Sequence, residues 1–400
     1  MFLLSIPEDI LYFISGLGIL QGFFLAALVY FHPKSDRSVN IFLALYIFFL
    51  SCLIAMPLYL KVFSWQKSTF LQPLPMLIGP LLYLYLRSFK EKITWRKAWP
   101  HFIVFVLFII PVTWHVLRMG AKYPDAKEIP PEILTHPVTM ALMHARLVHL
   151  IIYYFLGRKV LGTYQRSIEH LFSETSRISL NWAKVLLNGH LLLFITVLII
   201  FSLMFRNPEQ FNLYLLTNMG IATVFIYIAT VKSISQPTLW QIKASMGKEE
   251  LEHEMEEAEA MDIHTAKLES PKLAKPGLND DKMYAVITRI TELMEKEKLY
   301  HEPELTLRQL ADKLGLPTYQ VSQVINDGMN RNFYDLINGY RVEEAKQLLL
   351  EPGNRNFTIL SIGFEAGFNS KTTFNTVFKK FTGHTPTEYR EKHRVQMAQA

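Results

Sequence analysis

Three ionisable side chains lie close together inside an otherwise apolar segment of this 400-residue chain: His144, Arg146 and His149. A guanidinium keeps its charge, and in a bilayer or an apolar core it is costly unless it meets an anion, water or backbone carbonyls. No Asp or Glu lies inside the apolar segments to neutralise it. We therefore predict a sensor pocket for an anionic or polar ligand, formed by His115, His144, Arg146 and His149. The alternative is a structural polar contact with His190 or Asn188.

Motifs for enzymatic chemistry are absent from the sequence. It contains no GxxxxGK[ST], HExxH, GxSxG or kinase glycine box. The single cysteine, Cys52, excludes an intrachain disulfide and a cysteine-based zinc site. None of the 13 histidines forms an HxxxH pair with an acid nearby. We therefore expect no enzymatic activity, no cofactor and no bound metal.

Two similar segments near the C-terminus, residues 306–326 and 358–382, suggest a different chemistry. In the first, Ala311 lies four residues before Gly315, and in the second Gly363 lies four residues before Gly367. A helix-turn-helix needs a small residue where its helices pack most closely, and glycine where the chain leaves the first helix. Apolar residues then return at i, i+3, i+4 spacing in both segments. This pattern predicts two helix-turn-helix motifs, with the second turn one residue longer.

The second helix of each motif, residues 318–325 and 371–380, carries polar side chains that could bond to DNA. Gln and Asn can pair with adenine edges, and Lys can reach guanine or a phosphate. The base-reading candidates are Thr318, Tyr319, Gln320, Ser322, Gln323, Lys371, Thr372, Asn375 and Thr376. The phosphate candidates, which would fix register rather than read sequence, are Arg341, Lys379, Lys380 and Arg390. The alternatives are simple solvent exposure for the readers and an ion pair with Glu343 or Glu344 for Arg341.

Capping signals and a connecting helix support the same arrangement. Thr306 with Gln309 predicts a capping box for the first motif, and Thr385, Pro386 and Glu388 fit the start of a final helix. Between the motifs, residues 332–350 predict an amphipathic helix of about 27 Å. A strut of this length can place two recognition helices in successive major-groove turns, about 34 Å apart.

Residues from about 282 to 395 resemble the AraC family of bacterial transcription regulators. The similarity is carried by NFYDLINGYRVEEAKQLL, SIGFEAGFNSKTTFNTVFKKFTG and TPTEYR. It implies that residues 318–325 and 371–380 enter the major groove of double-stranded DNA. The chain departs from the family at Thr372-Thr373-Phe374, where Ser-Tyr-Phe is common, and at Thr376, where Arg is common. The order of an apolar half followed by this domain also resembles the membrane-anchored regulators of Bacteroidetes-type bacteria.

The elements that precede this domain are strongly apolar. The chain is 50% hydrophobic and 19% charged, with a mean hydropathy of +0.17, whereas soluble domains carry about 25% charged residues. A bilayer core of about 30 Å needs roughly 20 apolar residues per helix. Seven candidate spans are found, at about Ile10–Phe31, Val39–Leu60, Phe70–Phe89, Ala98–Leu117, Val138–Leu156, Val185–Phe205 and Phe211–Val231. We expect an all-α fold: a seven-helix transmembrane bundle in residues 1–236, then a cytoplasmic all-α domain in residues 281–400.

Basic residues in the loops indicate the orientation of these spans. With the N-terminus outside, the inner loops hold 12 Lys and Arg and the outer loops hold 6. Because Lys and Arg favour cytoplasmic loops, this places the N-terminus outside and the C-terminal domain in the cytoplasm, at the inner membrane of a bacterium. An acidic connector, residues 237–280, has seven Glu between Glu249 and Glu259. It is either a solvated tether or a helix that pairs two protomers of a homodimer.

These features favour a membrane-bound one-component regulator. The apolar half would detect a small ligand or a signal in the lipid bilayer, and the cytoplasmic domain would bind DNA. The alternative is a transporter or channel whose helix-turn-helix tail is regulatory only.

Overall fold

The computed structural model describes the chain in ten stretches. They are residues 8–32, 37–56, 58–59, 71–123, 131–134, 136–176, 178–206, 211–234, 280–354 and 356–399. The regular elements in these stretches are helices, with one isolated antiparallel bridge and no β-strand, which confirms the predicted all-α class. The connector at 237–280 lies outside the described residues except for its last residue, Asp280.

The chain divides into two units. The first comprises Met1–Gly162 and Leu180–Ile242, and the second comprises Thr163–Ser179 and Lys243–Ala400. The sequence did not predict that residues 163–179, which follow the fifth apolar segment, would join the C-terminal unit.

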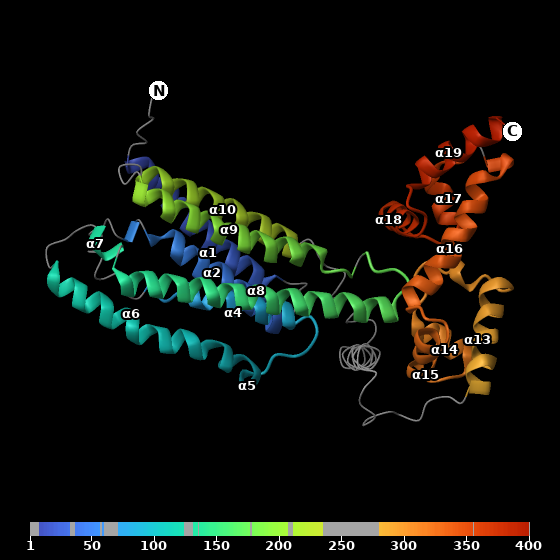
Figure 1. The fold of residues 1–400 in the computed structure, drawn as a ribbon, viewed down its shortest axis with the longest axis horizontal. Coiled ribbons are helices and arrows are strands. Elements are labelled where there is room, and N and C mark those ends of the chain that lie inside the picture. Colours follow the sequence, from blue (N-terminus) through green and yellow to red (C-terminus); the bar gives the residue numbers. More distant parts are fainter. Residues whose placement is uncertain are drawn as a thin grey trace. The chain divides into compact units, whose positions relative to one another are not determined.

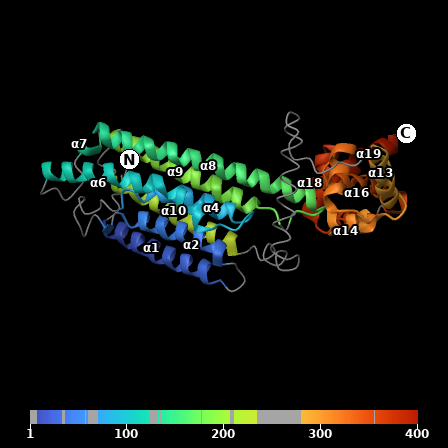
Figure 2. The same cartoon turned by 90° about the horizontal axis from the view of Figure 1, so that it is seen from below.

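Long helices pack side by side in the first unit (Figures 1 and 2). They are α1 Glu8–Phe31, α2 Arg37–Ile54, α4 Pro75–Arg87, α6 Ile103–Lys122, α8 Pro137–Leu171, α9 Asn181–Arg206 and α10 Phe211–Ile234. The short helices α5 Trp95–Ala98, η2 Trp99–Phe102 and α7 Pro131–Leu134 flank α6. Helix α1 contacts α2 and α10, α2 contacts α4, and α9 contacts α10. Each of the seven predicted apolar segments therefore contains a helix.

Small and polar residues allow the close packing of α1 on α2. A Cβ atom added at Gly22 would lie 1.9 Å from the Ser51 hydroxyl oxygen, so only glycine permits this approach. The Asn40 side-chain amide of α2 donates to the Val29 carbonyl of α1 at 2.7 Å. Such contacts are typical of helices that associate without a hydrophobic driving force, as in a membrane.

Four described helical segments are long and apolar enough to span a membrane. They are Arg37–Ile54, Trp95–Lys122, Pro137–Leu171 and Asn181–Ile200. The third predicted span forms only α4, whose 13 residues extend about 20 Å and so fall short of a bilayer core. The structure therefore supports four candidate spans where the sequence predicted seven.

The fifth predicted span is part of a much longer helix. Helix α8 has 35 residues and a length of about 52 Å, and it continues to Leu171 rather than ending near residue 156. Hydropathy falls after residue 156, but helix propensity does not, so the hydropathy signal marks the end of the apolar stretch and not of the helix. Residues 163–171 of α8 belong to the second unit.

The C-terminal part of the second unit is a series of short helices around one long helix. The elements are α13 Asp280–Glu295, η4 Leu299–His301, α14 Leu307–Leu314, α15 Thr318–Gln323, η5 Val324–Gly328, α16 Phe333–Leu350, η6 Pro352–Asn354, α17 Ile359–Glu365, α18 Lys371–Thr382 and α19 Pro386–Gln399. In Figure 1, α16 runs between α13–α15 on one side and α17–α19 on the other. Its apolar face contributes Val342, Ala345 and Leu349 to a core completed by α17 and α18.

Candidate nucleic-acid interface

The first helix-turn-helix is α14 followed by α15, as predicted. Thr306 caps α14 through its hydroxyl, which accepts from the Gln309 N–H at 3.2 Å, and the Gln309 side chain accepts from the Thr306 N–H at 2.8 Å. Gly315 ends the helix in the left-handed region, with φ 65°. Both the capping box and the turn glycine are therefore confirmed.

The second helix-turn-helix is α17 followed by α18. At Gly363 an added Cβ atom would lie 2.6 Å from a ring carbon of Phe374, so the small residue stands where the two helices touch. Gly367 leaves α17 with φ 89°, and Ser370 caps α18 by accepting from the Thr373 N–H at 3.0 Å. The turn residues between glycine and recognition helix number two in the first motif and three in the second, as predicted.

Helix α16 connects the two motifs. Asn332 caps it by accepting from the Asp335 N–H at 2.7 Å, and its 18 residues extend about 27 Å. The final helix α19 begins at Pro386, where the Thr385 hydroxyl accepts from the Glu388 N–H at 3.3 Å. These boundaries agree with the sequence analysis because capping residues define helix ends locally.

Helix α15 presents a mixed face. Thr318, Tyr319, Gln320 and Gln323 are half-exposed, and the Gln320 amide donates to the Tyr319 hydroxyl at 3.2 Å. Ser322 is only 6% exposed, which removes it from the set of residues that can reach a base edge. The sequence analysis placed Ser322 on the polar stripe, but Ser322 directly follows buried Val321 and precedes buried Ile325 by three positions, so it lies on the buried face of the helix.

Helix α18 is longer and has a clear polar face. Lys371, Thr372 and Thr376 are exposed, and Asn375 is half-exposed beside them. The opposite face buries Phe374, Val377 and Phe378 in the core. These four polar residues share one stripe because they recur at i, i+3 and i+4 spacing.

Arg341, the first phosphate candidate, is fully buried, with 0% exposure. Its guanidinium donates to the carbonyl oxygens of Tyr300 at 2.8 Å and Glu302 at 2.7 Å. Burial lowers the pKa of Arg341 to about 10, so it stays charged at neutral pH. In this position it cannot contact a phosphate, and the predicted phosphate role is wrong for this arrangement.

The alternative ion pair predicted for Arg341 does not form either. Glu344 pairs with Lys298 at 3.0 Å, and Glu343 pairs with Lys346 at 2.9 Å. Arg341 is only two and three positions from these acids in the sequence. In the structure, the chain before α14 instead lies against this face of α16 and supplies the carbonyl groups of Tyr300 and Glu302. That contact is non-local and has no local sequence signal.

The remaining phosphate candidates lie near the surface. Lys379 is exposed in the last turn of α18. Lys380 pairs with Asp335 of α16 at 2.6 Å. The Arg390 guanidinium donates to the Phe357 carbonyl through two nitrogens, each at 3.1 Å. Lys379 is thus the candidate best placed to contact a phosphate. To bind one, Lys380 would have to leave or share Asp335, and Arg390 would have to leave or share the Phe357 carbonyl.

The sensor candidates lie in the first unit, on α6 and α8. Arg146 donates to the backbone carbonyl of Gln72 at 2.8 Å and lies 5.4 Å from the centroid of the Phe108 ring. His115 bonds to the Thr139 hydroxyl at 2.8 Å. The structure therefore places Arg146 and His115 at contacts between α8 and neighbouring segments.

The two other sensor candidates do not join them in one site. His144 is exposed and bonds to the Met140 carbonyl of its own helix at 2.7 Å. His149 is 7% exposed and packs 4.8 Å from Tyr153, measured between ring centroids. The alternative partners are engaged elsewhere, since His190 bonds to Tyr46 at 3.0 Å and Asn188 accepts from Tyr154 at 3.1 Å.

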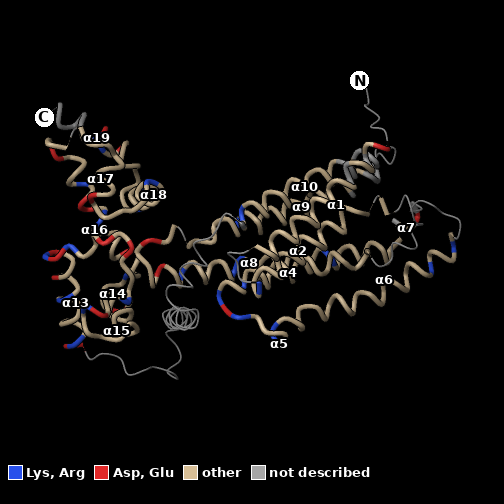
Figure 3. The backbone as a smooth tube through the Cα atoms, turned by 180° about the vertical axis from the view of Figure 1, so that it is seen from behind, with Lys and Arg blue, Asp and Glu red and all other residues tan. Residues whose placement is uncertain are grey.

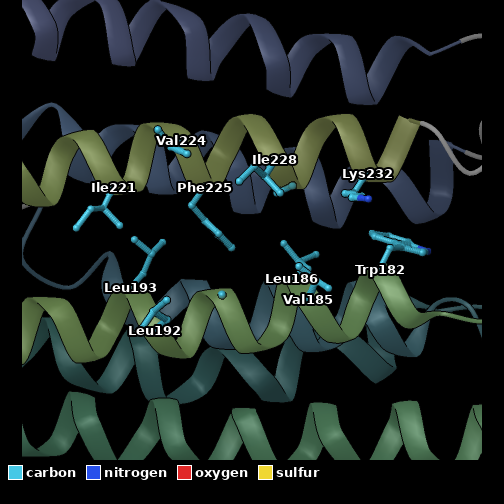
Figure 4. Close-up of a pocket in the computed structure, with 12 residues that line it drawn as sticks. Trp182, Val185, Leu186, Leu192, Leu193, Ile221, Val224, Phe225, Ile228 and Lys232 are labelled. Atoms are coloured by element: carbon cyan, nitrogen blue, oxygen red, sulfur yellow. The ribbon is translucent and has the colours of Figure 1, made fainter.

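A cavity of about 250 Å³ opens between α9 and α10 (Figure 4). Apolar side chains such as Trp182 line it together with Lys232, and none of the four sensor candidates does so. The cavity is therefore separate from the predicted sensor pocket.

Residues that the sequence analysis missed lie directly after α8. Ser173 bonds to Leu305, Asn338 and Arg341, and Glu174 accepts from Thr373 of the second recognition helix at 3.0 Å. Nothing in the local sequence predicts these contacts, because the partners are more than 130 positions away.

Comparisons with known proteins agree with the helix-turn-helix motifs of the C-terminal residues. Residues 310–392 match a family model described as a helix-turn-helix domain. A stretch of 113 residues is 33% identical to an uncharacterized HTH-type transcriptional regulator of Staphylococcus aureus strain COL, covering 28% of this chain and 14% of that protein. A stretch of 106 residues is 26% identical to the probable transcription factor PqrA of Proteus vulgaris, covering 26% of this chain and 84% of that protein. No solved structure matches the chain.

Proposed function

We propose that this chain is a membrane-bound bacterial transcription regulator of the AraC type, in which a cytoplasmic double helix-turn-helix binds DNA under the control of a transmembrane sensor. The observation that carries the proposal is the pair of helix-turn-helix motifs joined by α16. Each motif has its own recognition helix, and α16 spans about 27 Å. This length suits two recognition helices that enter successive turns of the major groove.

The polar face of α18 supports specific DNA recognition. Asn375 and Lys371 can bond to base edges, and exposed Thr372 and Thr376 lie on the same stripe. On α15 the corresponding residues are Thr318, Tyr319, Gln320 and Gln323. The similarity to proteins named as transcriptional regulators agrees with this role.

Apolar surface on the first unit supports a membrane location. In the best 18-residue windows of Trp95–Lys122 and Pro137–Leu171, only 28% and 17% of residues are buried. A soluble protein rarely exposes so much contiguous apolar surface. We infer that these helices face lipid and that a seven-helix bundle spans the bacterial inner membrane, in which the chain also crosses at α4 although this helix alone is shorter than the bilayer core.

The distribution of basic residues supports an orientation with the C-terminal unit in the cytoplasm. Figure 3 shows Lys and Arg gathered at the end of the first unit where α4 and α10 end. The segment from Arg87 to Lys97 contains five basic residues. Under the positive-inside rule, this end faces the cytoplasm and the N-terminus lies outside.

We further propose that Arg146 and His115 belong to the sensing region. Arg146 is a permanent cation whose one described hydrogen-bonding neighbour, Gln72, offers a backbone carbonyl at 2.8 Å and a side-chain oxygen at 3.5 Å. An anionic ligand can compete for a guanidinium held by neutral groups, because charge-assisted bonds to anions are stronger.

The test is DNA binding by the full-length chain in lipid nanodiscs. A random-sequence duplex pool should be enriched for a two-part site with half-sites about one helical turn apart. Lys379→Ala should then weaken all duplexes equally and reduce the salt dependence, as expected for a phosphate contact. A chain that inserts into membranes but enriches no sequence would refute the regulator and favour the transporter or channel alternative.

A further inference from the structure

The segment after α8 is built into the second unit by backbone contacts. Phe172 forms an antiparallel bridge with Thr306, the residue that caps α14. The Ser173 N–H donates to the Leu305 carbonyl at 3.1 Å, and the Ser173 hydroxyl donates to the same oxygen at 2.7 Å. The loop is thus attached to the start of the first helix-turn-helix.

The same loop also contacts the connecting helix α16. The Asn338 amide donates to the Ser173 carbonyl at 2.9 Å, and the Arg341 guanidinium lies 3.3 Å from the Ser173 hydroxyl oxygen. Ser173, Asn338 and Arg341 all have 0% exposure. A buried polar network of this kind specifies one arrangement, because each unpaired group would be costly.

The next residue, Glu174, reaches the second recognition helix. Its carboxylate accepts from the Thr373 hydroxyl at 3.0 Å and from the Ser176 N–H at 2.7 Å. Thr373 lies in the first turn of α18 and is 5% exposed, next to exposed Lys371 and Thr372. The second carboxylate oxygen of Glu174 is buried and has no hydrogen-bond partner among the described residues.

A carboxylate at this position bears directly on DNA binding. The N-terminus of a helix attracts anions, and DNA phosphates are the anions that a recognition helix meets. Glu174 already supplies a negative charge there, and it would repel an approaching phosphate. The loop also joins the first motif, α16 and α18, so it holds the two recognition helices in one relative arrangement.

We propose that residues 172–176 are an intramolecular partner of the helix-turn-helix pair, and that their docking on Leu305, Asn338, Arg341 and Thr373 weakens DNA binding. The inference rests on the proposed DNA-binding function. Because α8 runs directly into this loop, a rearrangement of α8 would release or retain it. Release removes the Glu174 carboxylate from α18 and frees the two motifs to adjust to their half-sites.

A disulfide lock tests the docking itself. The Ser173-to-Leu305 bond makes Phe172 and Thr306 a non-hydrogen-bonded pair, for which Cα atoms are about 4.5 Å apart, within reach of a disulfide. Cys52 is the only cysteine, so Cys52→Ser gives a cysteine-free background. In this background, Phe172→Cys with Thr306→Cys should form an intramolecular disulfide in nanodiscs under mild oxidation, and neither single variant should. Failure of the pair to cross-link would overturn the docking.

DNA affinity of the locked and reduced forms tests the regulatory effect. The probe is a duplex that the cysteine-free chain itself enriches from a random-sequence pool. Oxidation should weaken binding by roughly 5–150-fold, the range of coupling between linked sites, and reduction should restore it. Unchanged or tighter binding after oxidation would overturn the proposal. If the cysteine-free chain binds no DNA, the proposed function fails as well, while the disulfide yield still reports docking independently.

The charge is tested without a cross-link. Glu174→Gln keeps an oxygen that can accept from Thr373 but removes the negative charge, so it should tighten DNA binding several-fold, most strongly at low salt. Glu351→Gln removes the same charge from an exposed residue of the same unit and serves as the matched control. Equal effects of the two variants would show that only net charge matters and would overturn the specific role of Glu174.

Discussion

Arg341 gives the sharpest test of the structure, because the sequence and the tertiary structure assign it different roles. In Arg341→Ala, the carbonyl oxygens of Tyr300 and Glu302 lose donors that now lie at 2.8 and 2.7 Å. The Tyr300 bond is buried and the Glu302 bond is partly buried, and a buried carbonyl left unpaired costs about 1–3 kcal/mol. The charge of Arg341 also interacts favourably with the buried Glu174 carboxylate, so we expect a total loss of about 3–5 kcal/mol, the range for leaving a buried charge without its partner.

Arg341→Lys should recover only part of this loss. An ammonium keeps the charge but lacks the planar fork that reaches two carbonyl groups at once. Arg289→Ala is the control, since its side chain is 50% exposed and its pair with Glu292 lies on the surface. Removing such a pair should cost no more than about 1 kcal/mol.

Amide hydrogen exchange on the full-length chain in nanodiscs measures this effect locally. A loss of about 3–5 kcal/mol should speed exchange of the α16 amides by more than about a hundredfold, while α1 and α2 stay unchanged. If Arg341 instead held a phosphate, Arg341→Ala would leave α16 exchange intact and reduce the salt slope of DNA binding by about one. That pair of results would refute the interior role of Arg341.

Three further predictions concern a recognition helix, a close contact between two helices and the sensing region. Asn375→Ala should cost about 1–3 kcal/mol at one base position of the selected duplex and leave the others unchanged, and an unaltered base preference would show that this residue is not a reader. Gly363→Ala should destabilise the second helix-turn-helix by about 1–3 kcal/mol, because the new methyl group would lie 2.6 Å from a ring carbon of buried Phe374. Amide hydrogen exchange of α18 should therefore become faster. Gly353→Ala is the control and should leave α18 exchange unchanged, because a methyl group there meets nothing within 4 Å. Arg146→Leu should leave the chain inserted and able to bind DNA but unresponsive to its inducing condition in a transcription reporter, and normal induction would argue against the sensing role.

Local signals explain what could be predicted for the C-terminal unit. The Thr306–Gln309 capping box, the turn glycines and the Asn332 cap each depend on residues within four positions, so the sequence alone defines where these helices begin and end. The i, i+3, i+4 stripe likewise separates the buried and exposed faces of α18. The predicted stripe of the first recognition helix misplaced Ser322, because positions 322 and 325 lie on one face of a helix and Ile325 is buried.

In the apolar half, composition predicted where helices occur but not how long they are. Hydropathy ends near residue 156 while α8 continues to Leu171, and the third apolar segment yields only the 13-residue α4. Hydropathy reports the solvent around a helix, whereas helix length depends on propensity and on breaking residues such as proline.

The sequence by itself therefore determined the all-helical class, the two helix-turn-helix motifs and the face of α18 that could meet DNA. Only the tertiary structure decided that Arg341 is interior and that Ser173 and Glu174 belong to the second unit. Those contacts join groups separated by 39 to 199 positions along the chain. No local pattern encodes them, because a buried guanidinium or carboxylate is stabilised by whichever distant groups the complete fold brings to it.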